Sequence, residues 1–266
     1  MAETASIICP EKKVLIPDLQ AGCSLSDTIT ADQLRKWKEE NLGAVVVGYV
    51  NTTADVKAEC DYCCTSSNAV KVVRSIPPER PVLFLPDMFL GAYVAEVTKR
   101  KNMLIWPGEC HVHAGIKPEM VNSMLKEHQG AEFLIHPECG CTTSMMYYFG
   151  NGNGNGNGNG NGNGKHGAEE HDVKFFSTEG MMKRARSSEA DKFVVATETG
   201  ILYRMRRENP TKQFLPLSEN AICKYMKMIT LEKVHRSLTD MVHEVKVPEA
   251  TAAKAKLAIE RMLAIS

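Results

Sequence analysis

The sequence lacks any segment that could cross a membrane or direct secretion. Its N-terminus, MAETASIICPEKK, has neither the basic stretch nor the apolar core of a signal peptide. The longest apolar run, 44–50, is far too short to span a bilayer. An excess of one charge is also missing, because 32 basic residues balance 32 acidic ones. Proteins that bind nucleic acid or anionic membranes usually carry a basic excess, so we expect neither class and predict a soluble, cytoplasmic protein.

Disulfide bonds are not expected either, although the chain contains nine cysteines. An odd number of thiols cannot pair completely, and cysteines without an export signal more often bind metals or react. The compact C-x2-C-x2-C spacing of ferredoxins is absent. Free cysteines often behave as small buried hydrophobes. We expect this of Cys9, Cys60, Cys63 and Cys64.

What the sequence does contain is a repeated segment, an apolar run closed by a proline-bearing turn and followed by one cysteine. It reads VLIPDLQAGC up to Cys23, MLIWPGEC up to Cys110 and FLPLSENAIC up to Cys223. Three similar units that each deliver one thiol could direct three sulfurs to a common centre. Three thiolates suit an iron–sulfur cluster, whose remaining iron is then open to act as a Lewis acid. The spacing alone leaves a second interpretation open, three core cysteines at strand ends.

A zinc site is a further alternative. Its ligands could be the pairs Cys60/Cys63 and Cys139/Cys141, or Cys110 with His111 and His113. Structural zinc usually takes two tight pairs of suitable spacing, and the second pair here is separated by one residue only. The sequence therefore favours the iron–sulfur hypothesis over zinc.

Strand-like apolar runs alternate with helical patterns between successive repeated cysteines. We therefore expect an α/β fold, a repeat of three-layer α/β/α domains with short parallel sheets covered on both faces. The predicted domains are 23–109 and 110–222, with 1–22 as the remnant of a first domain and 223–266 as helices that pack back on it. A complete first unit would need roughly 64 further residues (87 − 23), so we expect a chain truncated relative to its ancestor.

The individual elements follow from the same patterns. The predicted strands are 44–50, 81–87, 102–108, 131–139 and 213–217, with a shorter one before Thr65, one at Val245 and Val247, and strand-then-helix segments at 174–185 and 191–208. The predicted helices are 27–42 with Thr30 as its N-cap, 53–60, 90–100, 117–129, 230–242 and one from Pro248. Residues 150–164, a glycine and seven Asn-Gly pairs, have no apolar side chain to bury, so we expect a disordered surface loop spanning roughly 20 Å.

Polar side chains of several kinds follow the predicted strands. Tyr49 and Asn51 end one strand, His136 and Glu138 follow the matching strand of the next unit, and His113 comes three residues after the second repeated cysteine. The carboxyl ends of parallel strands face the ligand crevice of an α/β sheet. Each residue by itself would be an ordinary surface group, but together they form a set of proton donors and acceptors.

Two strand-to-helix turns, TSSN at 65–68 and STEG at 177–180, offer hydroxyls and backbone amides at helix starts. Such turns bind phosphate or carboxylate groups. Ordinary helix capping by serine or threonine is the alternative.

Several of these segments together resemble one known family, quinolinate synthase. They are YVNTTADVKAECDYCCTSSNAV, GECHVH, HPEC, FFSTEGMMKR and VPEATAAKAKLAIERML, and the resemblance extends over nearly the whole chain except residues 142–172. It implies a pseudo-threefold arrangement of α/β/α domains around a [4Fe-4S] cluster with Cys23, Cys110 and Cys223 as its ligands. The implied reaction condenses iminoaspartate with dihydroxyacetone phosphate to quinolinate, with loss of phosphate and two waters, for NAD biosynthesis. Aspartate oxidase or aspartate dehydrogenase would supply the first substrate.

The resemblance also implies roles for the polar residues. Tyr49 and Asn51 would hold substrate, with Tyr49 also taking part in proton transfer. Ser66 and Thr178 would bind the phosphate or a carboxylate.

The remaining pocket residues implied by the resemblance are His113, His136 and Glu138, with Glu138 as the main general acid and base. The family also has an N-terminal His-x-Tyr stretch and a serine without counterparts in this sequence. We therefore expect little or no synthase activity from the chain by itself. A non-catalytic iron–sulfur or phosphate-binding module, or a fragment without function, are the alternatives.

Overall fold

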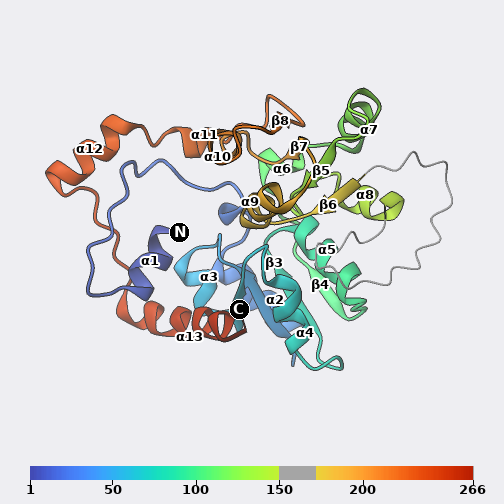
Figure 1. Ribbon diagram of the computed structural model, residues 1–266. Coiled ribbons are helices and arrows are strands. Elements are labelled where there is room, and N and C mark those ends of the chain that lie inside the picture. The colour runs from blue at the N-terminus through green and yellow to red at the C-terminus, as the bar shows by residue number, and fades with distance from the viewer. Residues whose placement is uncertain (150–171, 266) are drawn as a thin grey trace. The chain divides into compact units, whose positions relative to one another are not determined.

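The computed structural model describes residues 1–149 and 172–265 (Figure 1). The Asn-Gly tract lies outside the described residues. The chain divides into two compact units, which we call unit 1 (residues 1–109 and 223–266) and unit 2 (residues 110–222). No helix in the described ranges is long and apolar enough to cross a membrane.

Unit 1 contains a parallel sheet of four strands in the order β2-β1-β3-β4. Its strands are β1 (Val45–Tyr49), β2 (Tyr62–Cys64), β3 (Val82–Leu85) and β4 (Met103–Ile105). Its helices are α1 (Ala2–Ile8), α2 (Ala31–Glu40), α3 (Ala54–Ala58), α4 (Ala69–Ser75), α5 (Met88–Thr98), α11 (Lys224–Lys227), α12 (Leu231–Asp240) and α13 (Glu249–Ile265), with a 3-10 turn η1 (Ser26–Thr28).

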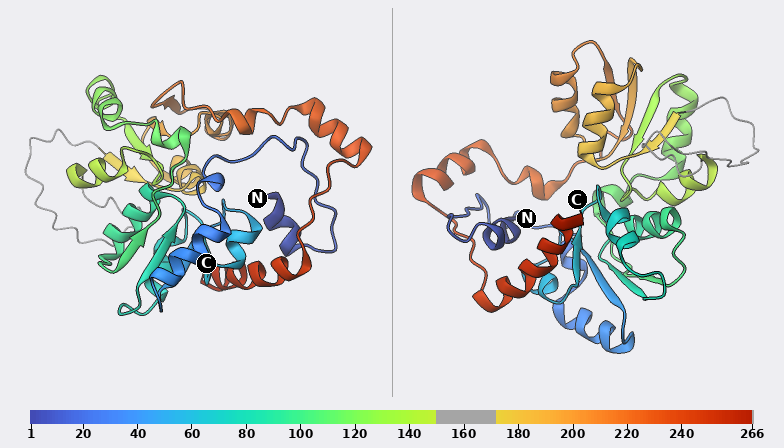
Figure 2. Two further views of the ribbon diagram at one scale, coloured as in Figure 1. Left: turned by 180° about the vertical axis from the view of Figure 1, so that it is seen from behind. Right: turned by 60° about the horizontal axis from the view of Figure 1, so that its bottom comes forward.

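The central strands of unit 1 are continuous apolar runs because both of their faces are covered. All five residues of β1, VVVGY, are buried, and so are all four of β3. Leu34 of α2 packs with Val46 and Leu83 in one core cluster. A second cluster joins Ile7 of α1 to Ile259 of α13 and to residues of α3 and β2. The long C-terminal helix therefore packs on α3 and β2 as well as on α1 (Figure 2).

Unit 2 repeats this topology with different residues. Its strands β5 (Glu132–Ile135), β6 (Asp172–Phe175), β7 (Lys192–Ala196) and β8 (Gln213–Pro216) are parallel and lie in the order β6-β5-β7-β8. Its helices are α6 (His111–Ala114), α7 (Pro118–Glu127), α8 (Thr142–Phe149), α9 (Thr178–Ser187) and α10 (Ile201–Glu208), and helices lie on both sides of the sheet (Figure 2). The predicted α/β fold class with short parallel sheets is confirmed.

The segments that follow the three repeated cysteines share one local structure. Helices α2, α7 and α12 each contain ten residues, and each begins eight positions after its cysteine (31 − 23, 118 − 110 and 231 − 223). Cys110 and Cys223 are the N-caps of the four-residue helices α6 and α11, with similar backbone angles. After Cys23 the same place is taken by η1.

The sequence prediction differs from the structure at several elements. The strand expected at Val245 and Val247 is wrong, because the described residues there form only one isolated bridge, between Leu15 and Glu244, and no neighbouring strand extends it. The helix expected from residue 27 begins at Ala31, where Thr30 and Gln33 form a reciprocal capping box with a Thr30 N to Gln33 Oε1 distance of 2.8 Å. The short helices α6 and α11 and the helix α8 were not predicted.

Candidate functional site

A buried group of titratable side chains lies at the carboxyl end of β5 in unit 2. His136 and Glu138 follow this strand, and α6 brings His113 beside them. His113 Nδ1 lies 3.4 Å from Glu138 Oε2, and His136 Nδ1 lies 3.9 Å from Glu138 Oε1. The two imidazole rings are stacked, with centroids 4.6 Å apart. The structure thus brings together three of the residues that the sequence predicted for one pocket.

Burial sets the charges of this group. Glu138 and His136 are each 3% exposed. Burial disfavours a charge on His113, but hydrogen bonds to Cys110 and Glu138 outweigh this cost and raise the pKa of His113 to about 10. Burial lowers the pKa of His136 to about 4, an effect that the nearby Glu138 only partly offsets. At neutral pH the imidazole of His113 is therefore protonated and charged and that of His136 is neutral, so that a charged and a neutral ring both face one carboxylate.

Cys110 lies next to this group. Its Sγ, a ring nitrogen of His113 and a carboxylate oxygen of Glu138 all lie within 4.8 Å of one another. Within residues 1–149 and 172–265, no other group of three or more such ligand atoms lies as close together. Within these residues, neither of the alternative zinc pairs is part of such a group. His111 is not part of the group either.

The cysteines fall into two classes by exposure. Cys23, Cys110 and Cys223 are in no disulfide bond and are partly exposed. Cys63, Cys64, Cys139 and Cys141 are buried, while Cys9 and Cys60, for which we also expected burial, are partly exposed.

Burial raises the pKa of Cys63 to about 11 and also raises the pKa of Cys139. Such thiols stay protonated at neutral pH and ligate metals poorly. Cys23, Cys110 and Cys223, like Cys9, are partly exposed and are not among these buried thiols.

The predicted substrate residues of unit 1 lie at the matching end of its sheet. Tyr49 is the last residue of β1 and is buried, and Asn51 follows it, partly buried. Thr52 Oγ1 donates a hydrogen bond of 2.9 Å to the carbonyl of Tyr49 and closes this turn. Ser66 is partly buried in the turn between β2 and α4. The side chains thus occupy the carboxyl edge that the parallel topology predicts.

The two strand-to-helix turns use their hydroxyls in different ways. In the STEG turn Ser177 caps α9 by accepting a hydrogen bond of 3.2 Å from Gly180 N, and the next residue, Thr178, is exposed. In the TSSN turn Asn68 Oδ1 accepts from Thr65 N at 2.7 Å. The hydrogen bond to the backbone is thus made by Ser177 in one turn and by Asn68 in the other. The hydroxyls of Ser66 and Thr178, the predicted ligand groups, take no part in these bonds.

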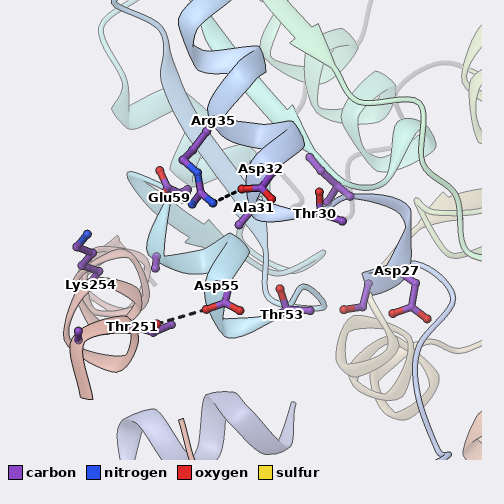
Figure 3. Close-up of a pocket in the computed structure, with 14 residues that line it drawn as sticks. Asp27, Thr30, Ala31, Asp32, Arg35, Thr53, Asp55, Glu59, Thr251 and Lys254 are labelled. Carbon is purple, nitrogen blue, oxygen red and sulfur yellow. Dashed lines mark hydrogen bonds and ion pairs between the residues drawn. The ribbon is translucent and has the colours of Figure 1, made fainter. Parts of the chain in front are cut away.

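A separate cavity of about 630 Å³ opens in unit 1 between α2, α3 and the start of α13 (Figure 3). Arg35 bridges Asp32 and Glu59 at its rim, and Thr251 Oγ1 lies 3.3 Å from Asp55 Oδ1. None of the predicted site residues lines this cavity.

One buried residue in contact with the site was missed by the sequence reasoning. The hydroxyl of Thr197 lies 2.9 Å from His113 Nε2, and Thr197 is 4% exposed. It follows β7 directly, so the rule that placed polar residues at strand ends could have found it. The segment VVATETG was read only as strand and helix.

Comparisons with known proteins agree with the motifs. The family model described as "Quinolinate synthetase A protein" matches residues 1–264. A quinolinate synthase of Thermus thermophilus is 51% identical over 265 residues, covering 100% of this chain and 78% of the relative. The quinolinate synthase of a Mycobacterium species (strain KMS) is 53% identical, with 74% of the relative covered, and that of Mycobacterium tuberculosis is 51% identical, with 72% covered. This chain therefore belongs to the quinolinate synthase family.

Proposed function

We propose that the chain is a [4Fe-4S]-dependent quinolinate synthase that condenses iminoaspartate with dihydroxyacetone phosphate, releasing phosphate and two waters. The observation that carries this proposal is the group in unit 2, where a reachable thiol adjoins a buried carboxylate that faces two stacked imidazoles. Condensation and dehydration both need protons to be removed and returned at one place, which this group suits. The identity of about half with curated quinolinate synthases supports the same assignment.

Cys23, Cys110 and Cys223 would hold the cluster in this proposal. Their donor chemistry fits it, because they are partly exposed thiols outside any disulfide bond, and each precedes a ten-residue helix by eight positions. When bound, such a cluster supplies a Lewis acid at the iron that lacks a protein ligand. We further propose that the three cysteines mark three repeats, with 1–22 and 223–266 belonging to the first.

The chain's own residues would divide the remaining work. Glu138 would move protons to and from the substrate, with His113 holding a proton beside it and His136 remaining neutral. Tyr49 and Asn51 would position the substrate at the edge of the unit 1 sheet, and Tyr49 would also exchange a proton with it.

Two hydroxyls would bind the anionic group of a substrate. Ser66 and Thr178 stand at helix starts where backbone N–H groups also point outward. The iminoaspartate would come from an aspartate oxidase or aspartate dehydrogenase, and a cytoplasmic location stays a prediction from the sequence.

The decisive experiment compares cluster content with product formation. The chain is reconstituted anaerobically, iron and sulfide are measured, and quinolinate is quantified by chromatography. Cys110→Ser should lose cluster absorbance and product together, whereas Cys9→Ser, a change at another partly exposed free thiol, should retain both.

An intact cluster without any product would contradict the proposal and indicate a binding module instead. The full-length Thermus thermophilus relative, assayed in parallel, tests the sequence-based expectation that this chain turns over slowly.

A further inference from the structure

The hydrogen bond between Thr197 and His113 joins two segments that are far apart in the sequence. Thr197 follows β7 and His113 lies on α6, 84 positions earlier. Their atoms Oγ1 and Nε2 are 2.9 Å apart, a good hydrogen-bond distance, and both residues are largely enclosed. A threonine hydroxyl rotates freely, so it can donate to an unprotonated Nε2 or accept from a protonated one.

The other contacts of His113 leave its ring with few alternative orientations. Nδ1 faces Glu138, and the ring stacks on His136. The backbone around it is also fixed, because Gly140 N donates a 3.0 Å hydrogen bond to the carbonyl of His113. A Cβ at Gly140 would lie only 2.7 Å from the carbonyl oxygen of Ala114, so this close approach requires glycine.

The end of β7 that carries Thr197 is itself tied to the segment that carries Glu138. The carbonyl of Ala196 accepts hydrogen bonds from His136 N at 3.0 Å and from Cys139 Sγ at 3.2 Å. The hydroxyl next to it is therefore held in a fixed place relative to both His136 and Glu138. A fixed donor and acceptor at this position can define which way the imidazole of His113 points.

We propose that Thr197 is a positioning residue that holds the imidazole of His113 with Nδ1 directed toward Glu138. The effect of this residue on catalysis rests on the proposed function. The orientation of the His113 imidazole does not, because it depends only on contacts within the chain. Without the hydroxyl, Nε2 has lost its partner in a buried place, and the ring is held toward the carboxylate only by its contacts with Glu138 and His136.

The test uses the isosteric change Thr197→Val, the conservative change Thr197→Ser and the matched control Thr199→Val two positions further along. For the reconstituted chain, Thr197→Val should lower kcat by between about 10-fold and 100-fold while KM changes little. A shift of about 1 Å in the position of a catalytic group can cost up to about 100-fold in rate. Thr197→Ser should restore most of kcat, and Thr199→Val should behave like the parent. Iron content and the unfolding midpoint are measured for each protein.

A second readout does not depend on turnover. In cluster-free protein, acylation of His113 by diethyl pyrocarbonate is followed by peptide mass spectrometry, with exposed His235 as the internal reference. Diethyl pyrocarbonate acylates only the unprotonated fraction of an imidazole, so all proteins are compared at one pH. Thr197→Val should accelerate acylation of His113 several-fold because the ring is held less firmly in its enclosed place, whereas Thr197→Ser should not.

The outcomes separate the two proposals. If no protein forms quinolinate but Thr197→Val still accelerates acylation of His113, the proposed function fails and the positioning role stands. If the parent forms quinolinate and Thr197→Val matches it in kcat and acylation, the inference is overturned. It is also overturned if Thr197→Ser is as impaired as Thr197→Val, or if only the unfolding midpoint changes.

Discussion

The two sheets have the same strand order, but the polar side chains at their carboxyl ends make different kinds of contact. In unit 1 the side chains bond mainly to the backbone. Thr52 donates to the carbonyl of Tyr49, the ammonium of buried Lys57 donates to the carbonyl of Thr52, and Asn68 accepts from Thr65 N. These bonds fix the shape of two turns without using the hydroxyl of Ser66.

In unit 2 the corresponding side chains interact with one another. His113, His136 and Glu138 form one buried group, and Thr197 adds a fourth member. Despite burial, hydrogen bonds to Cys110 and Glu138 raise the pKa of His113 to about 10, whereas burial lowers the pKa of His136 to about 4. A shared topology therefore decides where polar residues gather, whereas their type and partners decide whether that edge is suited to binding or to proton transfer.

The largest effect is expected from the substitution that removes the negative charge of Glu138 at the centre of the unit 2 group. Glu138→Gln should lower kcat by between about 10²-fold and 10⁴-fold, the usual contribution of a general acid or base. The measurement is the rate of quinolinate formation per intact cluster. Glu127→Gln, at an exposed carboxylate on α7, serves as the control. A Glu138→Gln protein with nearly parental kcat would mean that the unit 2 edge does not carry out proton transfer.

A smaller effect is expected at the two strand-to-helix turns. Ser66→Ala and Thr178→Val each remove a hydrogen bond to a charged group, which is worth about 1.5 to 3 kcal/mol. We expect KM for dihydroxyacetone phosphate to rise by between about 10-fold and 100-fold.

The control for the turns is Ser177→Ala in the STEG segment. Ser177 caps α9, so its loss should cost about 1 kcal/mol of stability in urea unfolding. Equal changes in KM for this control and for the two variants would show that the turns act on stability rather than on binding.

The smallest effect concerns the pH dependence of stability. The pKa of His136 is about 4 in the folded chain, against about 6.5 for an ordinary histidine. Between these values the unfolded chain binds more protons than the folded one. The stability contributed by neutral His136 is therefore complete above pH 6.5 and is lost as the pH falls toward 4, by at most about 1.4 kcal/mol per pH unit.

His136→Asn should flatten this part of the profile, which urea unfolding at pH 7.0, 6.0 and 5.0 would measure. Parallel profiles for the two proteins would indicate that His136 is not held in the neutral form.

Local patterns in the sequence predicted most of the regular structure. Apolar runs such as 44–50 correctly indicated buried parallel strands, and Thr30 indicated a helix start. The failures occurred where the pattern was short. Val245 and Val247 alternate with charged residues like a strand, but pairing with the segment 14–16 stays limited to one isolated bridge, and sequence periodicity does not say how far such pairing extends. The helices α6 and α11 contain four residues each, too few for a periodic signal.

The sequence also placed the candidate site residues at strand ends and singled out three cysteines by their repeated context. It could not distinguish capping hydroxyls from free ones, because Ser177 and Thr178 are neighbours of similar chemistry. Nor could it indicate that Thr197 contacts His113, since the contact depends on how β5 and β7 pair and on where α6 packs.

The sequence by itself determined the alternation of strands and helices, the three equivalent cysteines and the kinds of side chain available for chemistry, because these depend on residues a few positions apart. Only the tertiary structure decided which thiols are buried, which imidazole carries a proton and which hydroxyl orients His113. The physical reason is that desolvation and hydrogen bonding depend on neighbours brought together by packing, often from distant parts of the chain.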